Sequence, residues 1–300
     1  MSPPIYARLP DRGVLVVTGE DARPFLQGLV SNDVTVVALN RAVHAALLTP
    51  QGKYLFDFCI AEDGDGRLLL EAERGRLPDL HRRLSLYRLR AKVTLAIDDT
   101  LDVYAIIGDG AAAAFELPGM DAGAATPVAG GIVFVDPRLA ALGLRAMLPA
   151  ASGDRVLANR DLHPGDAAEW DRLRLAFGIA DGSRDMQIDK SLLLEGGFDR
   201  LSGIDFGKGC YVGQELTART KYRGLIKKRL VPVVVDGPLP APGTPVLAGD
   251  AVVGEVRSGT EGLALALLRI EALERAIAGD AQLKAGAASL RPRIPDWMNG

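Results

Sequence analysis

The sequence predicts an α+β fold. Two ferredoxin-like α+β units with antiparallel sheets precede a small C-terminal β-barrel, and all three are expected to surround a central cleft. Before Gly224, alternating apolar runs interchange with amphipathic stretches, as strands and helices do. After it, short apolar runs are cut by Gly and Pro. At 300 residues and 48% hydrophobic content, the chain can bury several cores. We expect domains at residues 1–97, 98–225 and 226–300.

The first domain alternates strands with helices. A short helix with Pro24 in its first turn, where proline is tolerated, separates two expected strands. Asp63-Gly64-Asp65-Gly66 is a strong hairpin turn, and Leu77, Leu80 and Leu84 form one apolar stripe of a helix. This order predicts an antiparallel sheet with helices on it. The expected strands are Val14–Thr18, Val43–Thr49, Tyr54–Ile60, Arg67–Glu71 and Val93–Ile97, and the longer helix is Arg76–Tyr87.

The second domain repeats this order of elements. An Ala-rich stretch predicts a helix at Ala111–Leu117, and Trp170 lies on the apolar stripe of a helix at Asp166–Phe177, where core packing is the favoured role. Strands are expected at Leu101–Gly108, Ile132–Val135 and Leu142–Leu148.

The C-terminal domain contains short strands separated by Gly and Pro turns. Such spacing indicates a small barrel or sandwich, and we expect the barrel. Its runs are Leu230–Val235, Pro245–Leu247, Val252–Val256 and Leu263–Leu268, with the boundary near Gly224–Arg229.

Composition narrows the class of protein. A net charge of −3 argues against a generally basic nucleic-acid binder. The two cysteines, Cys59 and Cys210, are too few for a disulfide framework and fit a reducing compartment. Cys59 lies in an apolar strand and is expected in the core. The first residues lack the features of a signal peptide, and no apolar run is long enough to span a membrane. We therefore expect a cytoplasmic protein, with a processed organelle form as the alternative.

The sharpest chemical candidate is Cys210, within Lys208-Gly209-Cys210-Tyr211-Val212-Gly213-Gln214-Glu215. A lysine precedes it, and a run of basic residues follows between Arg219 and Arg229. Positive charge near a thiol favours the thiolate, which is a nucleophile and a soft-metal ligand. The alternative is a cysteine that packs quietly in a glycine turn, because free cysteines are usually small buried hydrophobes.

This motif, together with Arg219, resembles the signature of the YgfZ-type folate-binding proteins. These assist assembly or repair of iron–sulfur clusters and are related to the glycine-cleavage T-protein, an aminomethyltransferase. Four other stretches are similar to the family: Phe25–Asp33, Leu48–Lys53, Tyr87–Arg90 and Trp170–Arg174 with Gly178-Ile179. The resemblance covers nearly the whole chain.

The resemblance implies a reduced folate, such as tetrahydrofolate, in the central cleft. Glu195 is expected near the pterin, since a carboxylate can pair with a planar group that offers two donors. Arg219 and Arg223 are the candidates for the glutamate tail, because arginine forks fit carboxylates. Tyr211 is able to stack on a flat ring, and Lys208 completes the candidates beside the motif. The alternative for Glu195 and the basic run is a solvated surface.

Asp57, the remaining candidate for the folate site, is an acid in the middle of a hydrophobic strand. A buried acid needs a partner or shifts its pKa, whereas the alternative is the solvent face of a sheet. T-protein carries a catalytic aspartate in a comparable strand, after a Gly-Gly and within an Asp-Asp doublet. Here the doublets are replaced by Gln51-Gly52 and Phe56-Asp57, which puts aminomethyl transfer in doubt.

The resemblance implies an accessory protein rather than an enzyme, with a T-protein-like aminomethyl- or methyltransferase as the alternative. Its partners would be iron–sulfur client enzymes, such as RNA-modifying enzymes, or assembly proteins. Cys210 is then expected to complete a shared cluster site, to act as a redox thiol or to hold the folate loop in shape. The histidines His44, His81 and His163 lack metal-ligand spacing, so we expect no stably bound metal. Direct nucleic-acid binding is disfavoured by the net charge.

Overall fold

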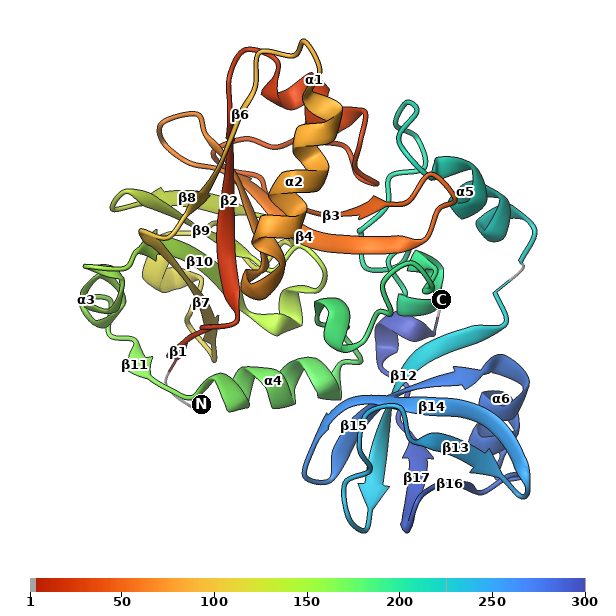
Figure 1. Ribbon diagram of the computed structural model, residues 1–300. Helices are drawn as coiled ribbons and strands as arrows, with labels where there is room; N and C mark the ends of the chain where they lie inside the picture. Colours follow the sequence, from red (N-terminus) through yellow and green to blue (C-terminus); the bar gives the residue numbers. More distant parts are fainter. Residues whose placement is uncertain (1–3, 225, 300) are drawn as a thin grey trace. The chain divides into compact units, whose positions relative to one another are not determined.

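The computed structural model describes residues 4–224 and 226–299, which form two compact units (Figure 1). The two-sheet unit comprises Met1–Pro50, Leu55–Trp170 and Leu201–Gln214, and the barrel unit comprises Gln51–Tyr54, Asp171–Arg200 and Glu215–Gly300. The start of the chain, before Pro4, and the expected domain boundary at Leu225 lie outside the described residues. The division into domains at 97 and 225 stays a prediction.

The first sheet of the two-sheet unit has the strand order β3-β4-β5-β2-β6. One face packs against helices α1 and α2, because Leu26 on α1 and the predicted stripe Leu77, Leu80 and Leu84 on α2 are all buried in one core. The strands are β2 (Arg12–Thr18), β3 (Val43–Leu48), β4 (Tyr54–Glu62), β5 (Leu68–Glu73) and β6 (Thr94–Asp98), and the helices are α1 (Ala22–Gln27) and α2 (Leu77–Arg88).

The second sheet has the order β11-β1-β7-β10-β9-β8, so the first strand of the chain joins the later sheet. The helix predicted at Ala111–Leu117 is wrong: only a 3₁₀ turn at Ala113–Phe115 forms, and Glu116 ends it at φ 56°. Pro118 follows the segment directly and disfavours helical backbone at the residue before it. The elements are β1 (Ile5–Arg8), β7 (Leu101–Ile107), β8 (Ala125–Val128), β9 (Gly131–Val135), β10 (Leu144–Pro149), β11 (His163–Pro164), α3 (Gly153–Ala158) and α4 (Ala167–Ala176).

The two sheets share a core in which Cys59 and Trp170 are 2% and 3% exposed, which confirms the core roles predicted for both. A chain of buried ion pairs runs through this interior. Arg145 contacts both Glu71 and Asp136 at 3.4 Å. The remaining members are Arg12, which pairs with Glu71, and Arg138, which pairs with Asp136. We call these five residues the ion network.

The barrel unit contains a closed barrel with the order β12-β15-β14-β13-β16-β17. Its interior is lined by small and branched apolar residues such as Val231, Ala264 and Leu290. The elements are β12 (Lys228–Asp236), β13 (Pro245–Ala248), β14 (Ala251–Thr260), β15 (Leu263–Arg269), β16 (Leu283–Ala285), β17 (Ala288–Pro292), α5 (Gln214–Tyr222) and α6 (Ile270–Ala278). The predicted class, α+β with antiparallel sheets and a C-terminal barrel, is confirmed.

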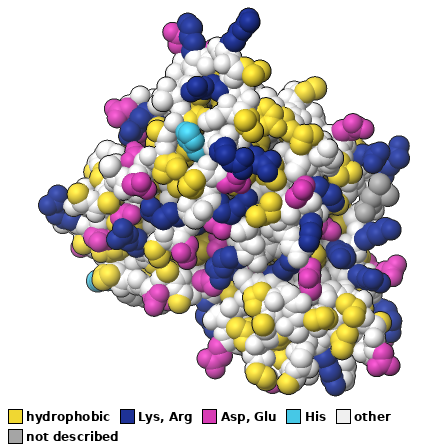
Figure 2. All heavy atoms as spheres, viewed as in Figure 1, with side chains coloured by type: hydrophobic (Ala, Val, Ile, Leu, Met, Phe, Trp, Pro, Cys, Tyr) yellow, Lys and Arg dark blue, Asp and Glu magenta, His cyan; other side chains and the backbone are white. Residues whose placement is uncertain are grey.

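The surface carries charges of both signs, interspersed across the face seen in Figure 2. No helix among the described residues is long and apolar enough to cross a membrane.

Candidate functional site

Residues 203–213, which we call the cysteine loop, lead into helix α5. Asp205 shapes the turn, since its Oδ1 accepts hydrogen bonds from the backbone N–H groups of Gly207 at 2.6 Å and Lys208 at 3.2 Å. Gly213 then takes φ 82°, a left-handed conformation that favours glycine. The second glycine of the motif is therefore required by the turn that starts α5.

Lys208 clamps this loop to the segment before β3. Its Nζ donates hydrogen bonds to the carbonyl oxygens of Val30 and Asn32, both at 2.7 Å, and lies 5.2 Å from the centre of the Tyr211 ring. Lys208 is 9% exposed. Burial lowers its pKa to about 8, although Asp33 and Asp205 oppose the shift. The lysine predicted as a folate neighbour is thus held against backbone oxygens.

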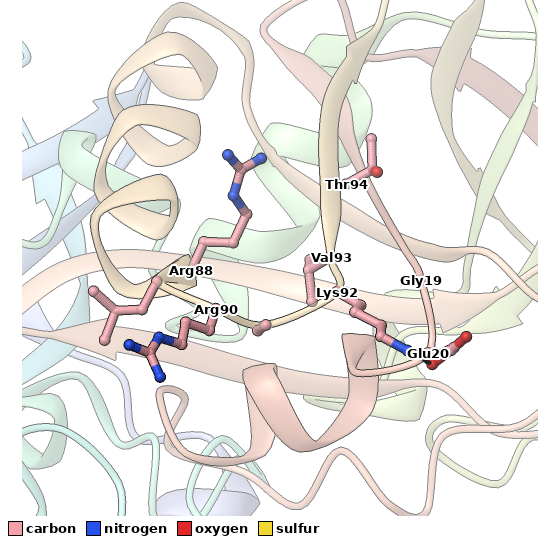
Figure 3. A pocket seen from close by; sticks show the side chains of 9 residues that line it. Gly19, Glu20, Arg88, Arg90, Lys92, Val93 and Thr94 are labelled. Carbon is pink, nitrogen blue, oxygen red and sulfur yellow. Dashed lines mark hydrogen bonds and ion pairs between the residues drawn. The ribbon is translucent and has the colours of Figure 1, made fainter.

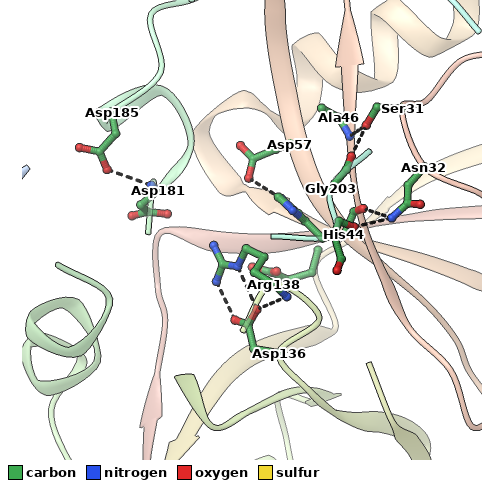
Figure 4. A network of polar contacts seen from close by, with 12 residues as sticks. Ser31, Asn32, His44, Ala46, Asp57, Asp136, Arg138, Asp181, Asp185 and Gly203 are labelled. Atoms are coloured by element: carbon green, nitrogen blue, oxygen red, sulfur yellow. Dashed lines mark hydrogen bonds and ion pairs between the residues drawn. The ribbon is translucent and has the colours of Figure 1, made fainter. Parts of the chain in front are cut away.

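Two further side chains of the same segment contact Ser202 and Gly203, where the cysteine loop begins. The Ser31 hydroxyl donates to the carbonyl of Gly203 at 2.6 Å, and the Asn32 amide donates to the carbonyls of Ser202 at 2.6 Å and His44 at 2.7 Å (Figure 4). Sequence reasoning missed the contacts with Ser202 and Gly203, which join residues 170 and 172 positions apart. The available signal was that Ser31 and Asn32 stand in one of the stretches similar to the family.

Asp57 is buried and paired. Its Oδ2 lies 3.2 Å from Nε2 of His44 on the neighbouring strand, and the two residues are 6% and 2% exposed. The solvent-facing alternative for Asp57 is therefore wrong. Because the carbonyl of His44 accepts from Asn32, whose own carbonyl accepts from Lys208, a polar chain links Asp57 to the cysteine loop.

The two cysteines occupy opposite environments. Cys210 is a free, exposed thiol on the cysteine loop, whereas Cys59 is a free, buried one. Burial raises the pKa of Cys59 well above its ordinary value, and the nearby Glu71 and Asp136 raise it further. Because the side chain of Cys210 faces solvent, it contributes little packing to the loop. Its thiol is accessible to reagents and to partner proteins.

The remaining candidates lie in the barrel unit. Glu195 is half-buried in a 3₁₀ turn, Leu193–Gly196, and its Oε2 accepts a hydrogen bond from the backbone N–H of Leu192 at 2.9 Å. Arg219 on α5 and Arg223 just after it are exposed. Their roles toward folate stay predictions.

Within residues 4–224 and 226–299, no group of three or more His, Cys, Asp or Glu side chains is arranged to hold a metal ion.

Two comparisons concern the fold. The model of the family described as "CAF17, C-terminal beta-barrel domain" matches residues 227–300. The crystal structure of the glycine cleavage system aminomethyltransferase T from Bartonella henselae superposes with a TM-score of 0.79 over 99% of this chain and 86% of that one. Its sequence identity is 14%, so the likeness concerns the fold alone.

Two relatives of known family are similar to this chain in sequence. The iron-sulfur cluster assembly factor IBA57, mitochondrial, of Homo sapiens is 35% identical, and its counterpart in Mus musculus is 33% identical. Each comparison spans 97% of this chain and 84% of the relative. Both relatives are mitochondrial by name, which contradicts the cytoplasmic location expected here. That expectation rested on the small number of cysteines and on the lack of a signal peptide and of a membrane-spanning run, none of which distinguishes the cytoplasm from another reducing compartment.

Proposed function

The chain belongs to the IBA57 family of iron–sulfur cluster assembly factors, and from that premise we propose that it helps to assemble, maintain or repair iron–sulfur clusters in client proteins. The observation that carries this proposal is the exposed thiol of Cys210 on a loop that hydrogen bonds hold to residues 30–32. Lys208 of the loop donates to Val30, and Ser31 and Asn32 donate to the start of the loop. Cysteine thiolates are the usual ligands of such clusters.

Cys210 supplies one ligand of a cluster in transit. Clusters usually take about four protein ligands, and one thiol cannot hold the cargo alone. The other ligands come from the client or from an assembly protein, which must approach an exposed thiol. A loop whose position is fixed by the hydrogen bonds of Lys208 lowers the entropic cost of that encounter.

A reduced folate is the second part of the proposal, in line with the finer resemblance to YgfZ-type proteins. Glu195 has the chemistry for the pterin: Oε2 is used by Leu192, while Oε1 has no hydrogen bond to any residue that the structure describes. Arg219 and Arg223 are exposed cations able to meet a glutamate tail. The full-length likeness to an aminomethyltransferase fold supports this expectation.

Aminomethyl or methyl transfer to folate is the alternative, and that likeness of fold favours it. Asp57, the acid in the comparable strand, is 6% exposed and lies against His44. A carboxylate so enclosed is less able to meet a substrate, so we favour the assembly role.

The decisive experiment is complementation of cells that lack their own homologue. Cys210→Ser should lower the activity of a [4Fe–4S] enzyme in extracts on the order of tenfold or more, with an unchanged melting temperature of the purified variant. Cys59→Ala is the matched cysteine control and should retain function once its stability is verified. Support of the enzyme by Cys210→Ser at the wild-type level would overturn the proposal.

Folate binding is tested separately by calorimetric titration with tetrahydrofolate. Glu195→Gln should weaken binding, whereas Glu215→Gln, an exposed acid at the start of α5, should not. Wild-type protein that releases no heat with tetrahydrofolate would remove the folate from the proposal and leave the cluster role standing. Turnover of a lipoyl-linked aminomethyl donor with tetrahydrofolate would instead establish the transferase.

A further inference from the structure

A hollow of about 500 Å³ lies at the C-terminal end of α2, lined by Gly19, Glu20 and residues 88–94 (Figure 3). Lys92 forms an ion pair with Glu20 at 2.7 Å. Arg88 and Arg90 extend away from that pair, and neither side chain has a hydrogen bond or ion pair with any residue that the structure describes. The hollow therefore offers two unpartnered guanidinium groups.

Leu89, between these arginines, is held in an unfavourable conformation. Its φ is 43° and its ψ −107°, a region that leucine avoids, and its side chain is 88% exposed. Leu86 and Tyr87 are also exposed, at 67% and 38%. Contacts within the chain do not compensate for an exposed, strained leucine, and strain of this kind tends to occur at binding sites. We call residues 86–92 the α2 tip.

We propose that the α2 tip is a docking site for an acidic segment of a partner protein, one whose carboxylates stand next to apolar side chains. Arginine forks pair with carboxylates through two parallel hydrogen bonds. Leu86 and Leu89 supply the apolar contact, and arginine and tyrosine are enriched in protein interfaces. This site is separate from Cys210 and goes beyond the cluster function.

The composition of the α2 tip, exposed arginines beside exposed apolar side chains, favours a protein over a nucleic acid as the anionic partner. Nucleic-acid phosphates would leave the exposed side chains of Leu86 and Leu89 in water, whereas a peptide with apolar side chains would cover them. Stabilisation of the helix dipole explains a cation in the last turn, such as Arg88. It explains neither Arg90, beyond the helix end, nor the conformation of Leu89.

The first test measures binding of the full-length protein to a fluorescein-labelled peptide, Glu-Leu-Asp-Glu-Leu-Glu, by fluorescence anisotropy. Added salt should weaken binding, and the Gln/Asn version of the peptide should bind poorly. Arg88→Glu with Arg90→Glu should weaken binding about tenfold or more. Arg155→Glu is the matched control, an exposed arginine in the last turn of α3, and should change affinity less than about twofold.

A second variant separates docking from folding. Leu89→Gly relieves the positive φ, so its melting temperature should be unchanged or higher while its peptide affinity falls. Absence of wild-type peptide binding, equal binding of the Gln/Asn peptide or an equal loss in Arg155→Glu would overturn the proposal. So would tighter, Arg88- and Arg90-dependent binding of an RNA oligonucleotide or of phosphatidylserine vesicles. If Leu89→Gly bound the peptide with wild-type affinity, the proposed apolar contact of Leu89 with the partner would be wrong.

Discussion

Two regions of the two-sheet unit bury charge in different ways. In the ion network, the carboxylates of Glu71 and Asp136 meet arginine side chains directly. In the cysteine loop, the ammonium group of Lys208 donates to two backbone carbonyl oxygens and lies near the Tyr211 ring. Charged partners compensate for the loss of water far better than neutral dipoles do.

The pKa values follow this difference. Burial raises the pKa of Asp136 and of Glu71, but the charges of neighbouring arginines outweigh it and leave both pKa values below their ordinary range. For Lys208, burial prevails and the pKa falls to about 8. The network is thus a fixed element of the core, whereas the loop that carries Cys210 is fastened by contacts that are easier to break.

The largest expected effect comes from breaking the network. Arg145→Ala removes the guanidinium that joins Glu71 to Asp136 and rests 4.2 Å from the Trp170 ring centre. The free energy of unfolding should fall by about 3–5 kcal/mol, because carboxylates stay buried with fewer partners. Urea denaturation measures this loss.

Arg82→Ala is the control for that change. Arg82 pairs with Asp79 on the surface of α2, and its loss should cost less than about 1 kcal/mol. If Arg145→Ala lowered the free energy of unfolding no more than Arg82→Ala does, the ion network would not be a fixed element of the core.

A smaller loss is expected in the loop. Lys208→Met removes the hydrogen bonds to Val30 and Asn32 and should destabilise the protein by about 2 kcal/mol. Amide hydrogen exchange of residues 203–213 should accelerate, and iodoacetamide should modify Cys210 at a changed rate. Lys92→Met removes an exposed ion pair and should leave both rates unchanged. Unaltered exchange in Lys208→Met would show that the lysine does not fasten the loop.

The last effect, comparable with the loss at the loop, is the dependence of stability on pH. The folded pKa of Lys208, about 8, lies below the ordinary value of 10.5, so between these values the unfolded chain binds more protons. Stability of the wild type relative to Lys208→Met should therefore rise by about 2 kcal/mol from pH 7 to 10. The network behaves oppositely: its lowered carboxylate pKa values add stability that is lost as pH falls below about 4. The measurement is the urea midpoint of each protein from pH 7 to 10. A difference between the two midpoints that does not change with pH would contradict the prediction for Lys208.

Much of the fold could be predicted from local pattern. The stripe of α2, the hairpin turn after β4 and the barrel strands are encoded by periodicity and by Gly and Pro. Helix α5, which starts inside the cysteine motif, was not predicted, because its apolar periodicity is weak. The helix predicted at Ala111–Leu117 does not form: its alanine content favoured a helix, but Gly110 before it and Pro118 after it did not.

The sequence by itself determined the class of fold, the family resemblance and the choice of Cys210 as the chemical candidate, because these depend on local pattern and on a contiguous motif. Only the tertiary structure decided which residues hold the loop that carries this cysteine. Ser31 and Asn32 contact Gly203, Ser202 and Lys208 across roughly 170 positions of the chain, and Asp57 lies against His44 on the next strand. A buried polar group is compatible with many partners, and folding alone decides which of them lies within hydrogen-bond distance.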